Sequence, residues 1–174
     1  MKQPCAKTMT AARQRQGKHY GASIAAIACL LLLALAPVPP AAATTERLVV
    51  DWHTGLAIGG YDPVAFYTDG KPLPGSPDFE LPYGGAVWRF ANLGNRAAFA
   101  ERPDVYMPQF GGYDPLGVAR GIAVAGSPSI WLITDGRLFL FYDRDRLEIF
   151  AADSARIIAA AERKWPDVLQ TLSQ

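Results

Sequence analysis

Cysteine and histidine are scarce in this chain of 174 residues, which holds two of each. Both cysteines, Cys5 and Cys29, lie within the first 43 residues, and so does one of the histidines. Residues 44–174 therefore contain no cysteine, which excludes a disulfide, a thiolate metal ligand and a thiol nucleophile from this part of the chain. Its one histidine, His53, supplies too few ligands for an ordinary zinc site.

Basic residues are outnumbered in the same part of the chain. The first 43 residues hold five basic groups and no acid, whereas residues 44–174 hold 12 basic and 16 acidic groups, a net charge of −4. Proteins that bind nucleic acid need clustered Lys and Arg to displace counterions. The acidic balance therefore predicts that nucleic acid is not a partner.

The first 43 residues have the order of a secretory signal. A basic region is followed by an apolar stretch of 15 residues, 22–36, then by three prolines and by Ala41-Ala42-Ala43, a small-x-small cleavage pattern. The apolar stretch is shorter than the roughly 20 residues that span a bilayer. We expect cleavage after Ala43 and a periplasmic or secreted protein with no membrane segment. The alternative is an uncleaved N-terminal anchor.

An internal repeat organises residues 44–174. The string GGYDP occurs at 59–63 and again at 111–115, offset by 52 residues. Residues 75–103 and 126–154, offset by 51, share eight identities in 29 positions without a gap. A repeat of this length indicates repeated structural units. We interpret the chain as two related halves, about 59–110 and 111–162.

Each half predicts a β-hairpin followed by a helix. Apolar-rich runs flank Gly84-Gly85 in the first half and Asp135-Gly136 in the second, and both dipeptides are typical of hairpin turns. Phe99 and Phe150 hold matched positions on the helices, and we expect both to point into a shared core. The predicted class is α+β. The expected strands are 79–83, 86–90, 130–134 and 137–141. The expected helices begin at the caps Asn92 and Asp143; the first runs to about residue 102, and the second places Leu147, Phe150 and Ala151 on one face.

Proline defines two further expectations. The stretch 69–82 contains four prolines, a density that favours a loop with turns. A C-terminal helix from about 153 to 164 would place Ile157, Ala161 and Trp165 on one face, and Pro166 marks its expected end.

Three short motifs resemble those of exported bacterial YHS-domain proteins. They are GYDPVA at 60–65, WRFA at 88–91 and PQFGGY at 108–113, and the resemblance covers nearly all of residues 44–174. It implies a small YHS-like domain over residues 44–174. YHS domains are similar to the small metal-binding modules beside copper-transporting ATPases, in which cysteines supply the ligands.

The position that would carry a thiolate differs in this chain. Exported YHS relatives commonly have a cysteine directly after the second Gly-Gly-Tyr, where this sequence has Asp114. A carboxylate binds harder ions and does not select Cu(I). No cofactor is therefore predicted. A divalent metal is the open alternative, with His53 and Asp114 as its candidate ligands.

The two GYDP segments have two interpretations. They supply Tyr61 and Asp62 in the first half and Tyr113 and Asp114 in the second. In the structural interpretation, each Asp caps a helix that begins with proline, and each Tyr packs with its hydroxyl bonded. In the functional interpretation, the two Tyr-Asp pairs surround a symmetric pocket at the junction of the halves. Close carboxylates there would share a proton or a cation.

The segment between the halves is rich in aromatic residues. Tyr106, Met107, Phe110 and Tyr113 crowd a proline-containing stretch and could line an apolar pocket. The alternative is that these side chains belong to the core.

His53 has one acidic neighbour, Asp51, two residues before it. If this segment is a strand, the two side chains face the same side and can pair or chelate an ion. The alternative is a histidine at the surface near a loose N-terminus.

No motif of an established catalytic site is present. Serines lie in Gly-Ser-Pro and Ser-Pro-Ser turns, without a nucleophile elbow, and no glycine-rich phosphate loop occurs. We therefore predict a non-enzymatic exported binding module whose ligand is a small molecule, a metal ion or an envelope protein. The alternative is a small enzyme or a hard-metal-binding protein that uses a site of carboxylate, Tyr and His.

Overall fold

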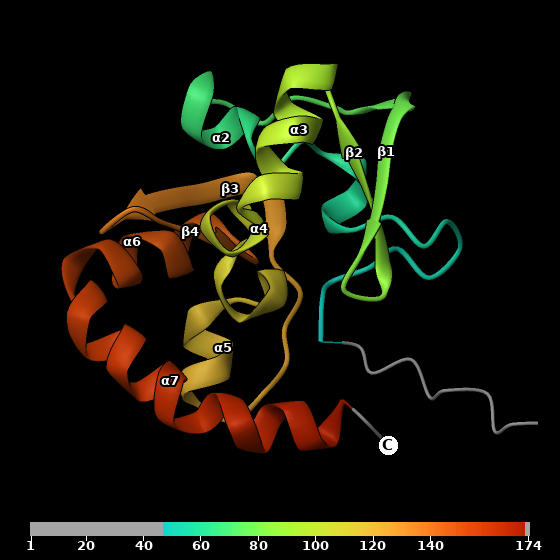
Figure 1. The fold of residues 1–174 in the computed structure, drawn as a ribbon. Helices are drawn as coiled ribbons and strands as arrows, with labels where there is room; N and C mark the ends of the chain where they lie inside the picture. The colour runs from blue at the N-terminus through green and yellow to red at the C-terminus, as the bar shows by residue number, and fades with distance from the viewer. Residues whose placement is uncertain (1–46, 173–174) are drawn as a thin grey trace, which may run out of the picture. The chain divides into compact units, whose positions relative to one another are not determined.

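Two antiparallel hairpins, each followed by helices, organise residues 47–172, which the computed structural model describes (Figure 1). The predicted α+β class is confirmed. The leader and its cleavage site lie outside the described residues. Among residues 47–172, every helix is too short or too polar to traverse a bilayer.

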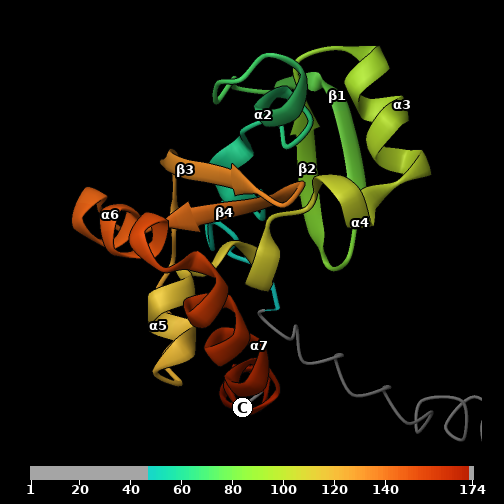
Figure 2. The same ribbon diagram turned by 90° about the vertical axis from the view of Figure 1, so that its left-hand side faces the viewer.

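The same elements occur twice in the same order, which confirms two related hairpin–helix halves. The second set begins about 51 residues after the first. Figures 1 and 2 show both hairpins with the helices that follow them. The first set consists of η1 (Ile58–Gly60), α2 (Ala65–Thr68), β1 (Ser76–Tyr83), β2 (Ala86–Phe90), α3 (Leu93–Glu101) and α4 (Pro103–Tyr106). The second consists of η2 (Gln109–Gly112), α5 (Pro115–Ala119), β3 (Ser127–Thr134), β4 (Arg137–Phe141), α6 (Arg144–Ala152) and α7 (Ser154–Thr171).

Both hairpin turns are as predicted. Tyr83 pairs with Ala86 around Gly84-Gly85, and Thr134 pairs with Arg137 around Asp135-Gly136. All four turn residues have positive φ, between 51° and 86°. Two consecutive left-handed residues match the right-handed twist of the strands that they connect, which explains the glycines. The caps are also confirmed, because the side chain of Asn92 accepts from Asn95 N and that of Asp143 from Arg146 N.

The predicted loop over 69–82 is wrong in its last part, because β1 begins at Ser76 and includes Pro77 and Pro82. In the described part of the chain this sheet has two strands, so β1, which carries both prolines, keeps one edge outside the ladder, where a missing N–H costs little. The ladder is also irregular between Ser76 and Glu80, which accommodates Pro77.

The predicted shared core is wrong as well, because the described residues form two clusters. Phe99 and Phe150 are both fully buried, yet they lie in different clusters. The ring of Phe99 packs 4.9 Å from that of Trp88, and the ring of Phe150 packs 4.9 Å from that of Phe139. Each helix anchor therefore closes the core of its own half.

Strand β4 separates the two clusters. Its successive side chains point to opposite faces: Leu138 and Leu140 belong to the Phe99 cluster, and Phe139 and Phe141 to the Phe150 cluster. All four are buried. The second hairpin thus completes the core of the first half while it supports its own.

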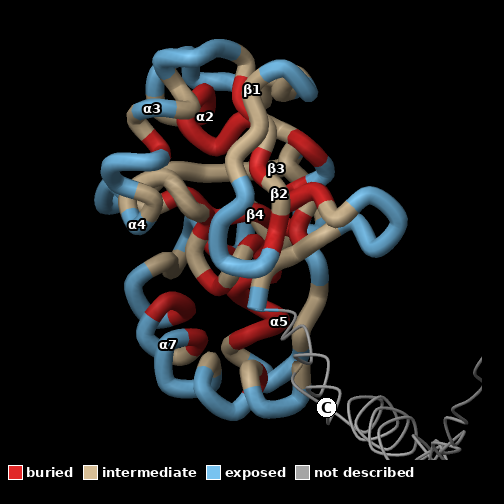
Figure 3. Tube along the Cα trace, turned by 45° about the vertical axis from the view of Figure 1, so that its right-hand side comes forward, coloured by how far each residue is buried: buried red, intermediate tan, exposed pale blue. Residues whose placement is uncertain are grey.

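Helix α7 provides the cover for the second half. The buried residues of α5 lie against it (Figure 3). The helix continues through Pro166 to Thr171, so the expected end near residue 164 is wrong. Val168, only 1% exposed, docks in the Phe150 cluster. Proline removes one backbone hydrogen bond, to the carbonyl of the exposed Glu162, and burial of Val168 offsets that loss.

Candidate functional site

Asp62 is fully buried and connects several elements of the first half through hydrogen bonds. Its Oδ1 accepts from the backbone N–H groups of Val64, at 2.8 Å, and Ala65, at 3.3 Å. Its Oδ2 accepts from Ala91 N, at 2.8 Å, and from the Asn95 side-chain amide, at 2.6 Å. One carboxylate thus joins the start of α2, the end of β2 and the start of α3.

Asp114 holds the equivalent position in the second half and is also fully buried. It caps α5 by accepting from Leu116 N and Gly117 N, with Pro115 in the first helical position, so the cap interpretation is confirmed here. It also accepts from Tyr142 N, at 3.0 Å, and from the Arg146 guanidinium, at 3.2 Å. These donors lie one repeat after those of Asp62.

The two tyrosines of the GYDP segments lie in separate clusters. Tyr61 is half-buried against the Phe99 cluster, whereas Tyr113 is buried in the other cluster, with its ring centroid 6.1 Å from that of Trp165. Tyr113 also lines a depression of about 280 Å³ with Ala123 and Leu172. The described structure therefore assigns the Tyr-Asp pairs to two interiors, one in each half.

His53 lies in an exposed turn, which agrees with the interpretation of a histidine at the surface and not with a strand face shared with Asp51. Oδ1 of Asp51 accepts from His53 N, from Thr54 N and from the Thr54 hydroxyl. The backbone hydrogen bond from Thr54, followed by that of its hydroxyl, lowers the pKa of Asp51. Across residues 47–172, no three His, Cys, Asp or Glu side chains lie close enough to hold a metal ion.

A cavity of about 320 Å³ lies where the two halves meet. It combines the start of the described chain, the first hairpin turn, the segment between the halves and α7. Its lining residues are Arg47, Leu48, Tyr83, Gly84, Met107, Pro108, Gly111, Trp165 and Leu169.

Of the four residues expected to line an apolar pocket between the halves, Met107 lies in the lining of this cavity. Tyr106 instead packs edge-to-face on Tyr67, with ring centroids 5.5 Å apart. Phe110 is buried, with its ring 5.7 Å from that of Trp165. Sequence reasoning missed Tyr83 and the α7 residues because they lie far from Met107 along the chain.

Gly111 of the lining belongs to a backbone turn in η2 that has a counterpart in η1 of the first half. Phe110 and Gly111 have φ of 53° and 62°, and Ile58 and Gly59 have φ of 43° and 63°. A left-handed conformation costs a residue with a side chain about 1 kcal/mol or more. Gly111 allows a close approach, since its O accepts from Val49 N at 2.7 Å and a Cβ on it would overlap the Arg47 carbonyl.

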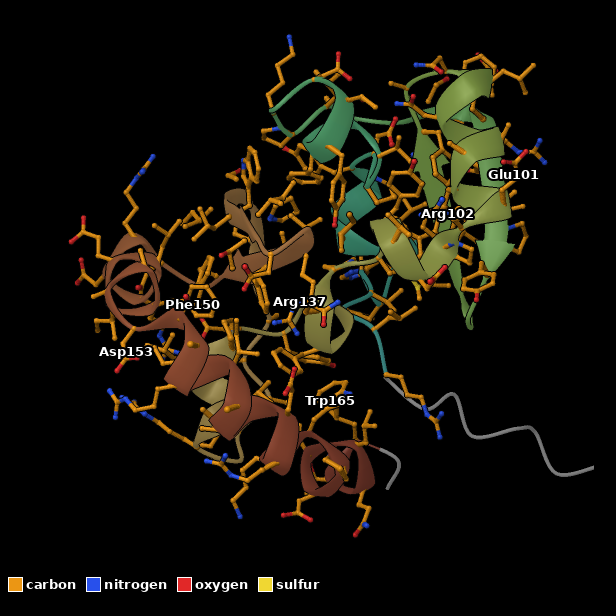
Figure 4. All side chains as sticks on the ribbon, turned by 60° about the vertical axis from the view of Figure 1, so that its left-hand side comes forward. Glu101, Arg102, Arg137, Phe150, Asp153 and Trp165 are labelled. Carbon is orange, nitrogen blue, oxygen red and sulfur yellow. The ribbon has the colours of Figure 1, made fainter. Side chains whose placement is uncertain are left out.

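Trp165, which lines the cavity, is held in place by the docking of α7. An ion pair between Arg137 of β4 and Glu162 of α7, at 2.9 Å, links this helix to the second hairpin. Figure 4 labels Arg137 and Trp165 on these two elements. The ring of Trp165 also contacts those of Phe110 and Tyr113. The wall is therefore fixed by contacts that do not depend on a ligand.

The cavity suits an apolar molecule with a negative group. Leu48, Met107, Pro108 and Leu169 supply apolar surface, and Tyr83 and Trp165 supply aromatic surface. Among the described residues that line the cavity, Arg47 is the only charged one, and it is exposed. Small-molecule sites commonly combine apolar walls with a few polar groups in this way.

Comparison of the chain with family models, with curated proteins and with solved structures finds no match in any of the three.

Proposed function

We propose that residues 44–174 form an exported, YHS-like binding module that holds a small, largely apolar molecule in the cavity between its halves. The cavity itself is the observation that carries this proposal. Its volume of about 320 Å³ falls at the lower end of the range for small-molecule sites, roughly 300–1,000 Å³. The module acts by binding and has no catalytic role.

The composition of the lining supports a carboxylate ligand in particular. Arg47 can pair with an anion at the rim, while the ring of Trp165 and the thioether of Met107 contact an aromatic or aliphatic body. The ligand class is therefore a compact organic acid with an apolar body.

Calorimetric titration of the mature protein with naphthalene-2-carboxylate tests the site. We expect one bound molecule and weaker binding of the neutral naphthalene-2-carboxamide, because the amide cannot pair with Arg47. Leu169→Gln should weaken binding at least fivefold, since it places an amide in the apolar wall. The matched control is Leu93→Gln, at a residue that is 61% exposed on α3 and should leave binding unchanged.

Two results would contradict the proposal: no binding of either compound, or equal binding by the Leu169→Gln variant. Titration with Cu²⁺, Zn²⁺ and Fe²⁺ tests the metal alternative in the same instrument. Stoichiometric metal binding that His53→Ala abolishes would favour that alternative over the cavity.

Export and membership of the YHS family belong to the same proposal. The order of the first 43 residues and the three motifs described above support them. Mass spectrometry of the protein recovered from the periplasm or the medium should give an N-terminus at Thr44. Recovery of the full chain from the membrane fraction would favour an uncleaved anchor.

A further inference from the structure

The two halves differ at one pair of aromatic positions. In the first half, Tyr67 of α2 and Tyr106 at the end of α4 pack edge-to-face, with ring centroids 5.5 Å apart and planes at 85°. The register that aligns Asp62 with Asp114 and Phe99 with Phe150 places Ala119 and Ile157 at these positions. The second half therefore has small or aliphatic side chains where the first has two rings.

A groove of about 230 Å³ lies at this place, between α5, α6 and α7. Leu116 and Ile157, 6% and 8% exposed, form its apolar base. Figures 1 and 2 show α5 lying along α7, with α6 beside them. The full lining is Leu116, Ala119, Arg120, Ile149, Arg156, Ile157 and Ala160.

The rim of the groove carries positive charge. Arg120 and Arg156 are the only charged residues among the described ones that line it. Arg156 pairs with Asp153, whereas the guanidinium of Arg120 has no carboxylate within ion-pair distance in the described part of the chain. Ile149 borders the groove and is 54% exposed, which extends the apolar surface beyond it.

We propose that this groove docks an aromatic side chain from an acidic segment of a partner protein. An aromatic ring is expected because, in the first half, the position equivalent to Ala119 carries the ring of Tyr67. Arg120, which pairs with no described carboxylate, favours a carboxylate next to the ring. The exposed Ile149 offers a further apolar contact at the edge of the groove. The groove lies apart from the cavity between the halves, so the two proposals can fail separately.

Fluorescence anisotropy with a labelled peptide of sequence EDYDE tests the docking. We expect saturable binding to the mature protein, at least a tenfold loss when the Tyr is replaced by Ala, and a clear loss when the acids are replaced by Asn and Gln. In the protein, Ala119→Tyr rebuilds the ring of the first half inside the groove and should abolish binding. Ala159→Tyr is the matched control, because Ala159 is exposed on α7 outside the groove.

The charge contribution has its own pair of variants. Arg120→Gln should weaken binding about two- to fivefold, the range for an exposed ion pair, and Arg163→Gln, an exposed arginine of α7 outside the lining, should not. Circular dichroism of each variant confirms folding before it is compared. Equal binding by Ala119→Tyr and the wild type would overturn the proposal. It would also be overturned if free 4-hydroxyphenylacetate bound with the same dependence on variants while the peptide did not, since the ligand would then be a small aromatic acid.

Discussion

At the scale of single residues, the two buried aspartates determine how each half is assembled. Each carboxylate accepts from two N–H groups at the start of a short helix, from one at the end of a hairpin and from one side chain of the next helix. A buried acceptor with all its donors is stabilising, but the loss of the acceptor leaves several buried donors unpaired. The pattern gives these aspartates an architectural role in both halves.

We therefore expect Asp62→Asn to lower the free energy of unfolding by about 2 kcal/mol or more. The new amide group would place a donor opposite Ala91 N or Val64 N, both of which donate to the present carboxylate. Urea unfolding followed by circular dichroism measures the change. Asp78→Asn is the control, because Asp78 is exposed and its side chain accepts a single hydrogen bond, of 3.3 Å, from the Ser76 hydroxyl, so its change should stay within about 0.5 kcal/mol.

Tyr67 makes stability depend on pH at the alkaline end. Burial raises the pKa of its phenol, and the nearby Tyr106 adds to the shift. The unfolded chain therefore releases this proton first, at its ordinary pKa near 10. The contribution of Tyr67 is complete below pH 10 and is lost as pH rises through the folded pKa.

The difference in the free energy of unfolding between the wild type and Tyr67→Phe should therefore be constant up to about pH 10. Above that pH, the wild type should lose stability relative to Tyr67→Phe. Urea unfolding at several pH values between 8 and 11 gives this difference directly. Tyr142→Phe, at a residue that is 60% exposed, serves as the control. A parallel pH profile for the wild type and Tyr67→Phe would show that Tyr67 does not titrate differently in the two states.

At the scale of elements, the local signals predicted well what depends on local structure. Turn dipeptides, the caps Asn92 and Asp143 and the strand β2 match the structure because each depends on neighbours within a few residues. The expected start of β1 and the expected end of α7 are wrong, because both rest on the assumption that proline interrupts a strand or a helix. In both places the cost of proline is offset elsewhere, by a free strand edge for Pro77 and by the burial of Val168 for Pro166.

The candidate site was harder to predict than the elements. Met107 was identified from the crowding of aromatic and apolar residues in one segment, which a sequence displays. Arg47, Tyr83 and Leu169 were not, because they contact the cavity only after the first hairpin and α7 have docked. The roles of the two aspartates likewise depend on donors about 30 residues away.

The docking of α7 beyond Pro166 can be tested directly. Val168→Ala should lower the free energy of unfolding by roughly 2 kcal/mol, because Val168 is 1% exposed and its truncation leaves a cavity in the Phe150 cluster. Gln170→Ala, on the exposed side of the same turn, should change stability by less than about 0.5 kcal/mol. Thermal and urea unfolding give both values. Equal, small effects would mean that the helix after Pro166 contributes no packing energy.

At the scale of the whole described chain, the two halves have separate clusters but share a strand. Leu138 and Leu140 of β4 are fully buried in the Phe99 cluster, although they belong to the second half of the sequence. Without them, Trp88 and Phe90 of β2 would lose one wall of their core. The first half is therefore incomplete by itself, even though its elements match those of the second.

This shared strand predicts a single cooperative unfolding transition. Trp88 reports on the Phe99 cluster and Trp165 on the Phe150 cluster. In a variant that retains only Trp88 or only Trp165 of the four tryptophans, the urea midpoint from fluorescence should coincide with the midpoint from circular dichroism of the same variant. Leu140→Ala should move both midpoints together and lower stability by about 2–5 kcal/mol, whereas Leu93→Ala, at an exposed position of α3, should move neither. Two separate midpoints would show that the halves fold independently. In that case β4 would form a contact surface between two independently folded halves, because loss of its packing in one cluster would not unfold the other cluster.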